Sequence, residues 1–90
     1  MSKVREDVIE RHLVKEVKKA GGIAYKFTSP GRRGVPDRIV LLPHDKIIFV
    51  ECKATSEKPR PDQLREHAKL FALEFHVVVL DSKDLGNVLN

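Results

Sequence analysis

The chain has 90 residues, a length that suits one domain and leaves no room for a second of ordinary size. Its 17 Lys and Arg residues against 13 Asp and Glu give a formal net charge of +4, which is compatible with nucleic-acid binding but does not require it. A single cysteine excludes an internal disulfide framework, and the sequence has no signal peptide and no apolar run long enough to span a membrane. We therefore expect a cytoplasmic protein with no membrane partner.

The first half of the chain predicts a helix followed by three strands. Apolar residues recur at helical spacing over residues 3–20, and a glycine pair ends that helix. Residues 23–28 alternate as a strand does. Residues 38–42 and 46–53 are two further apolar strands, and the short turn between them predicts an antiparallel hairpin.

The second half predicts a helix, a strand and a short final helix. The helix begins at Pro61, a residue favoured at the first helical position, and continues to about residue 73. Residues 75–80 are apolar enough to form a fully buried strand, and Asp81 or Ser82 could cap the last helix. The order αβββαβα predicts an α/β fold in which helices cover both faces of a mixed sheet.

Two carboxylates and a lysine lie at the ends of the two hairpin strands. Asp37 precedes the first strand, whereas Glu51 and Lys53 end the second and project from the same face, because alternate side chains of a strand do so. Carboxylates that converge repel each other unless a cation lies between them, and such hard oxygen ligands suit Mg²⁺ or Mn²⁺. A lysine beside the ion could orient water towards a phosphate. The pattern predicts metal-dependent phosphodiester hydrolysis, although a Glu51–Lys53 salt bridge and a turn aspartate are the structural alternatives.

These residues resemble a known nuclease family. Gly34-Val35-Pro36-Asp37, then Glu51-Cys52-Lys53 and the downstream Gln63, are similar in order and spacing to the VRR-NUC family of the PD-(D/E)XK nuclease superfamily, in its small stand-alone viral or bacterial form. The resemblance extends from about Glu6 to about Asp81, through Gly21-Gly22, Tyr25-Lys26, Ser29-Pro30 and Arg38. It implies one nuclease domain over residues 1–90 with a restriction-endonuclease-like α/β/α sandwich and a mixed four-stranded sheet.

The resemblance also implies roles for individual residues. The expected catalytic set is Glu10, Asp37, Glu51, Lys53 and Gln63, and the metal ligands are Asp37, Glu51 and the backbone carbonyl of Cys52. Glu10, in the run Glu-Arg-His-Leu-Val ahead of Gly21, matches the helix acid of archaeal Holliday-junction resolvases, and Glu6 is its rival one turn earlier. Both acids lie towards the apolar arc of the helix. Gln63 could anchor the metal-bound water or Lys53. His67, one turn later, could line the same face, but we favour a structural role for it.

A loop rich in Gly, Pro and Arg is the best candidate for contact with DNA. Small residues let a backbone approach closely, and paired arginines can bind phosphates bidentately. The predicted DNA-binding residues are Lys26, Ser29, Arg32, Arg33, Arg38, Lys58 and Arg60. Some of these charges could serve solvation alone. Nothing resembles a base-reading helix or a zinc module, so we expect recognition of shape and phosphate.

The sequence thus predicts a metal-dependent, structure-selective DNA endonuclease of recombination or repair. Small stand-alone VRR-NUC proteins resemble Holliday-junction resolvases, which act as homodimers, and a twofold dimer presents two sites for the two symmetric cuts of a four-way junction. The expected dimer surface is the Phe71–Val79 region. A flap or nicking endonuclease acting as a monomer is the alternative enzyme. A catalytically silent DNA-binding module is the alternative from another class.

Overall fold

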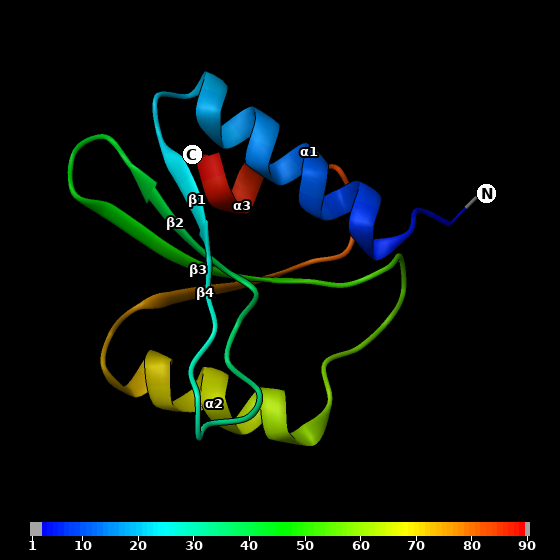
Figure 1. Cartoon of the computed structure of the whole chain (residues 1–90), viewed down its shortest axis with the longest axis vertical. Helices are drawn as coiled ribbons and strands as arrows, with labels where there is room; N and C mark the ends of the chain where they lie inside the picture. Colours follow the sequence, from blue (N-terminus) through cyan, green and yellow to red (C-terminus); the bar gives the residue numbers. More distant parts are fainter. Residues whose placement is uncertain (1–2, 90) are drawn as a thin grey trace.

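The computed structural model describes residues 3–89, and its elements follow the predicted order αβββαβα (Figure 1). The first half contains helix α1 (Glu6–Lys19) and strands β1 (Ile23–Lys26), β2 (Arg38–Leu42) and β3 (Lys46–Cys52). The second half contains helix α2 (Pro61–Ala72), strand β4 (His76–Leu80) and the one-turn helix α3 (Gly86–Leu89). Within residues 3–89, no helix has the length and apolar character that crossing a membrane demands.

The four strands form one mixed sheet in the order β1-β2-β3-β4. β1, β2 and β3 are successively antiparallel, and β4 lies parallel to β3. The predicted hairpin is confirmed, because Leu42 pairs with Lys46 across the turn. α2 lies in the crossover from β3 to β4 and covers the face of the sheet opposite α1 and α3 (Figure 1). The mixed four-stranded sheet with flanking helices is therefore the predicted α/β/α sandwich.

The main core lies between α1, α3 and the sheet. Ile9, Leu13 and Val17 of α1 recur at four-residue spacing, so they form one stripe, and all three are fully buried. They belong to a cluster with Val40 of β2 and Cys52 of β3, among other apolar residues. Since alternate residues of a strand face opposite sides, the burial of Cys52 here places its neighbour Glu51 on the α2 face.

The expectation of a fully buried strand at 75–80 is wrong. β4 begins at His76 and is an edge strand, with β3 as its one partner in the sheet. Leu80 is its buried residue, and the side chain of Val79 is 40% exposed. An apolar run indicates a strand, but burial also depends on what covers both faces, and that is decided by distant segments.

The cap of the last helix also differs from the prediction. α3 begins at Gly86, whose N–H donates to Asp84 Oδ1 at 3.0 Å. Ser82 Oγ accepts from the N–H of Asp84 at 3.2 Å instead of capping the helix. The prediction that Asp81 or Ser82 caps this helix is therefore wrong, because the helix starts further along the chain, at Gly86.

The loop before β2 is fixed to the start of α2. Gly34 has φ +84°, and a Cβ added there would lie 2.6 Å from the backbone oxygen of Asp62. On the same loop, Arg32 Nη2 lies 2.7 Å from Glu66 Oε1 of α2. The loop that leads into Asp37 is therefore positioned against α2 by a close backbone contact that needs glycine.

Gly34→Ala should lower the free energy of unfolding by about 2–4 kcal/mol, because it combines left-handed backbone strain with a backbone collision. Gly31→Ala is the matched control, since Gly31 has φ +82° and an added Cβ meets nothing within 4 Å. Strain alone should cost the control about 1–2 kcal/mol. Urea unfolding of both variants measures the difference, and equal losses would contradict the close contact at Gly34.

Candidate functional site

Polar side chains from three segments meet at one end of the sheet. β2 and β3 are antiparallel, so the residue before β2 lies beside the last residues of β3. Arg38 pairs with Val50, which places Asp37 next to Glu51. Gln63 provides the third segment, from the first turn of α2, where it is buried against this end of the sheet.

The carboxyl groups of Asp37 and Glu51 lie close enough together for each to influence the proton affinity of the other. Glu51 is 1% exposed, and burial is the largest cause that raises its pKa, followed by the charge of Asp37 and the hydrogen bond with it. Together they raise the pKa of Glu51 to about 8, although Lys53 opposes the shift. Asp37 Oδ2 also accepts from the backbone N–H of Cys52 at 2.7 Å. At neutral pH the pair therefore holds a proton in the absence of a cation.

Three side chains hold Glu51 in place. Gln63 Nε2 donates to Glu51 Oε2 at 3.1 Å, and His67 Nε2 lies 3.4 Å from Glu51 Oε1. Lys53 Nζ is 3.8 Å from Glu51 Oε2. Gln63 Oε1 accepts from the N–H of Arg60 at 2.8 Å, which orients the amide so that its nitrogen faces Glu51. All three side chains are buried, so the carboxylate has a fixed position.

His67 lies in the candidate site, although its sequence position favoured a structural role. Burial is the largest cause that lowers its pKa, and the nearby Lys53 lowers it further. The imidazole is therefore neutral near pH 7, and its contact with Glu51 is a hydrogen bond and not an ion pair. Its spacing of four residues from Gln63 had left open that it lines the same face, and the structure bears this out.

The two acids of α1 have different surroundings. Glu10 Oε2 accepts from Arg38 Nε at 2.7 Å, and Arg38 Nη1 donates to the carbonyl of Ala24 at 3.0 Å. Glu6 is exposed, contrary to the expectation that it lies within the apolar arc, because the buried stripe of α1 begins at Ile9. The pKa of Glu6 is raised, first by partial burial and then by Asp37. Glu10 is thus paired with Arg38, whereas the charge of Asp37 in the site affects the pKa of Glu6.

The start of α1 is tied to the segment that follows Lys53. The backbone N–H of Val4 donates to Thr55 Oγ1 at 2.9 Å, and the N–H of Thr55 donates to the carbonyl of Val4 at 3.0 Å. Lys53 is fixed in turn by its N–H, which donates to the carbonyl of Leu80 at 2.9 Å. These bonds hold the first turn of the helix beside the lysine.

The predicted DNA-binding residues divide into two groups. Arg38 is used inside the fold, and Arg32 and Arg60 form ion pairs with Glu66 and Asp62 at 2.7 Å and 3.2 Å. Ser29 is partly buried in the loop. Of the predicted DNA-binding residues, Lys26, Arg33 and Lys58 are exposed and form no ion pair within residues 3–89. Arg33 and Arg60 also line a groove of about 530 Å³ along α2, with Arg65 and Lys69.

The donor set suits a hard divalent cation held with water. Among the described residues there is no group of three or more His, Cys, Asp or Glu side chains arranged as a metal site. Mg²⁺ commonly uses one or two carboxylates and keeps several waters, which matches Asp37 and Glu51. Burial raises the pKa of the Cys52 thiol to about 12, so the thiol stays protonated, and the carbonyl is the ligand that Cys52 can offer.

The chain is similar to a phage protein and to a solved nuclease-family domain. "Putative nuclease p44" of Acyrthosiphon pisum secondary endosymbiont phage 1 is 71% identical over 89 residues, which cover 99% of this chain and 96% of that protein. A solved structure described as a VRR_NUC domain has a TM-score of 0.81 and 32% identity, and the match covers 89% of this chain and 87% of the other. No family model matches the chain.

Glu51→Gln should change how the stability of the metal-free protein depends on pH. The pKa of Glu51 is raised to about 8 in the fold, so the folded state binds the extra proton and stability falls as pH rises from about 4.5 to about 8. The slope should approach about 1.4 kcal/mol per pH unit. At about pH 8 in chelator, Glu51→Gln should therefore exceed the wild type in free energy of unfolding by several kcal/mol. Urea unfolding at several pH values measures this, and parallel pH curves would contradict it.

Proposed function

Because the chain belongs to the VRR-NUC family of nucleases, we propose that it is a metal-dependent, structure-selective endonuclease that hydrolyses phosphodiester bonds of DNA. The observation that carries the proposal is the close approach of the partly buried Asp37 carboxyl to the buried carboxyl of Glu51. Two acids in contact under burial are costly unless a cation joins them, and Lys53 stands beside them. This combination suits attack of water on a phosphodiester better than a purely structural salt bridge.

Each residue of the cluster has a distinct role in the proposed reaction. Asp37, Glu51 and the carbonyl of Cys52 would hold a Mg²⁺ or Mn²⁺ ion, which when bound supplies Lewis-acid activation of water and phosphate. Gln63 and His67 fix the carboxylate of Glu51, and the N–H of Cys52 fixes that of Asp37. The ammonium of Lys53 orients the attacking water and offsets the negative charge that builds on the phosphoryl oxygens.

The proposed substrate is a four-way junction or another branched DNA, bound by a homodimer in the bacterial cytoplasm. Exposed cations on loops, such as Arg33 and Lys58, suit contact with phosphates and not with base edges. A twofold dimer would present two sites for paired cuts. A monomeric flap or nicking endonuclease is the second candidate, since the cations of the groove along α2 would bind single-branched DNA as well.

Asp37→Asn and Glu51→Gln should each lower the hydrolysis rate at least 10³-fold with Mn²⁺, because each removes an oxygen ligand of the proposed ion. Asp45→Asn is the control, since Asp45 lies exposed in the β2–β3 turn, and it should retain the wild-type rate. The assay compares labelled four-way junctions, flaps and duplex DNA.

Paired symmetric nicks confined to junctions support the resolvase, and single nicks at flaps support the monomeric alternative. Equal rates for the wild type and Asp37→Asn would contradict an active site at this pair. Such equal rates would favour the interpretation of the chain as a catalytically silent DNA-binding module. Binding of Asp37→Asn to the same DNA should persist, which separates loss of chemistry from loss of substrate.

The two helix acids should separate activity from stability. Glu6→Gln should lower the hydrolysis rate roughly 10-fold or more, because Glu6 lies within electrostatic reach of Asp37 and Lys53, while the stability should change little. Glu10→Gln should lower the free energy of unfolding by about 1–3 kcal/mol, because it leaves Arg38 without its charged partner. Rates and urea unfolding of both variants test this. The opposite pattern would restore Glu10 as the catalytic helix acid.

A further inference from the structure

A small pocket lies between the loop that follows β1 and the end of α2. Its volume is about 380 Å³, and its apolar walls are Phe27 and Val35 from the loop and Leu70 and Leu73 from the helix end. We call it the loop–helix pocket. Figure 1 shows the chain after β1 passing down over α2 before it returns to β2, so two distant segments form the walls. Ligand pockets measure about 300–1,000 Å³, and one near the lower limit suits a group as small as a nucleobase.

Charged side chains form the rim of the loop–helix pocket. Arg32, Glu66 and Lys69 line it beside the apolar walls. Glu66 Oε1 lies 2.7 Å from Arg32 Nη2 and 3.3 Å from Lys69 Nζ. Positions 66, 69, 70 and 73 are three or four residues apart, so they follow one face of the helix. The charges of the rim therefore stand directly beside the apolar walls.

A cationic groove shares a wall with the loop–helix pocket. Glu66 and Lys69 also line the groove of about 530 Å³ along α2, here called the α2 groove, together with Arg33, Arg60 and Arg65. Of these cations, Arg33 and Arg65 form no ion pair within residues 3–89. An apolar pocket beside a groove with unpaired arginines is complementary to a nucleotide, which joins a flat base to an anionic phosphate.

The backbone connects the loop–helix pocket to the candidate site. The N–H of Phe27 donates to the carbonyl of Asp37 at 2.8 Å. Leu70 follows Gln63 by two turns of α2, which is about 10 Å along the helix axis. DNA rises by about 3.4 Å per nucleotide, so a base in the pocket would lie on the order of two to four nucleotides from a phosphate at Asp37 and Glu51. One DNA strand can therefore reach both places.

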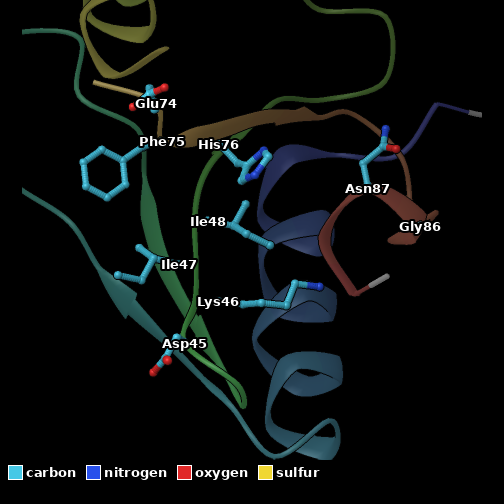
Figure 2. A pocket seen from close by; sticks show the side chains of 9 residues that line it. All are labelled: Asp45, Lys46, Ile47, Ile48, Glu74, Phe75, His76, Gly86 and Asn87. Atoms are coloured by element: carbon cyan, nitrogen blue, oxygen red, sulfur yellow. The ribbon is translucent and has the colours of Figure 1, made fainter. Parts of the chain in front are cut away.

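A second pocket, at the hairpin end of the sheet, suits a nucleotide less well. It has a volume of about 490 Å³, and its lining includes Asp45 and Glu74, whose charges repel phosphate. Figure 2 shows Lys46 on one side of the sheet and Ile47 on the other, so the lining is divided between the two faces. β3 runs from this pocket to Glu51, which places the pocket at the opposite end of the sheet from the candidate site.

We propose that the loop–helix pocket holds one unpaired nucleobase of a branched DNA while the neighbouring phosphates lie in the α2 groove. The inference rests on the proposed nuclease and adds how a branch is recognised. A base that is paired and stacked in a duplex must be extruded to enter a pocket, whereas an unpaired base enters at a smaller cost. Phe27 offers a ring on which any base can stack, so the contact selects unpaired structure and not sequence.

The test measures how far binding depends on the unpaired base. Phe27→Leu removes the stacking ring, and Phe75→Leu is the matched control, because each ring contacts Phe49, at centroid distances of 5.8 Å and 5.7 Å. Phe75 lines the pocket at the hairpin end instead. Fluorescence anisotropy in chelator gives the affinity for a labelled flap DNA, and for the same DNA with an abasic site at each unpaired position near the branch in turn.

Loss of the base should weaken binding at one position and only where the ring is present. The wild type and Phe75→Leu should each lose roughly 5- to 100-fold in affinity there, the range of base–aromatic stacking. Phe27→Leu should lose less than about threefold, because the contact is already missing. Equal losses in Phe27→Leu and the wild type would overturn the inference. Circular dichroism verifies that both variants are folded.

A second pair of variants leaves the packing of Phe49 unchanged. Leu73 is 67% exposed and lines the loop–helix pocket, whereas Leu64 is 53% exposed and lines neither this pocket nor the α2 groove. Leu73→Glu should make binding insensitive to loss of the base, because a carboxylate replaces part of the apolar wall. Leu64→Glu adds the same charge and should keep the sensitivity of the wild type. Repulsion of phosphates alone would leave both variants sensitive, and that result would contradict the pocket.

The outcomes separate this inference from the proposed function, because binding in chelator requires no hydrolysis. Binding of flap DNA that depends on no unpaired base would overturn the base site, keep the nuclease, and favour an acidic peptide as the occupant of the pocket. Dependence on the base in a protein that hydrolyses no DNA would support the base site and contradict the nuclease. Failure to bind branched DNA would overturn both. If both hold, Phe27→Leu should cut flaps with Mn²⁺ at more scattered positions than Phe75→Leu.

Discussion

The fold brings two acids into contact where water is largely excluded, and the surrounding structure compensates for that contact. Asp37 and Glu51 meet because antiparallel pairing puts the start of β2 beside the end of β3. An amide, an imidazole and an ammonium surround Glu51, and a backbone N–H binds Asp37. The elements that deliver these groups also make up the scaffold, so the stability of the fold and the geometry of the site cannot be varied independently.

The crossover helix α2 contributes both to the stability of the fold and to the geometry of the site. α2 carries the chain from β3 to β4, and its buried face provides Gln63 and His67 instead of apolar residues. A helix that packs polar side chains against a sheet gains less from the hydrophobic effect than α1 does. This smaller hydrophobic gain agrees with the apolar side chains, such as Ile23, Leu41 and Ile47, that remain exposed on the α2 face of the sheet.

Local rules predicted much of this arrangement from the sequence. The alternation of side chains placed Glu51 opposite Cys52, and the short turn after Leu42 forced the hairpin register that brings Asp37 near Glu51. Both follow from residues close together in the chain. The type and order of the elements were predictable for the same reason, whereas strand and helix ends shifted by one to three residues.

What the sequence did not reveal depends on pairs that are distant in the chain. In the sequence, Arg38 resembled a residue that contacts DNA. In the structure, its guanidinium donates a hydrogen bond to Glu10 on α1. His67 resembled a packing residue, but its neighbour is an acid on another element. The burial of β4 could not be read from its apolar run, because the sheet order made it an edge. In each case a partner supplied by tertiary packing decided the role of the residue.

The bonds between Val4 and Thr55 have a practical consequence for anyone who fuses this protein to something else. They anchor the polypeptide a few residues beyond Lys53, so a purification tag or reporter joined upstream of Val4 would emerge next to the reactive groups. Figure 1 shows the last helix, α3 (Gly86–Leu89), on the α1 side of the sheet and running away from that end of the sheet. Attachment through the C-terminal side would therefore leave the approach of a polynucleotide unobstructed.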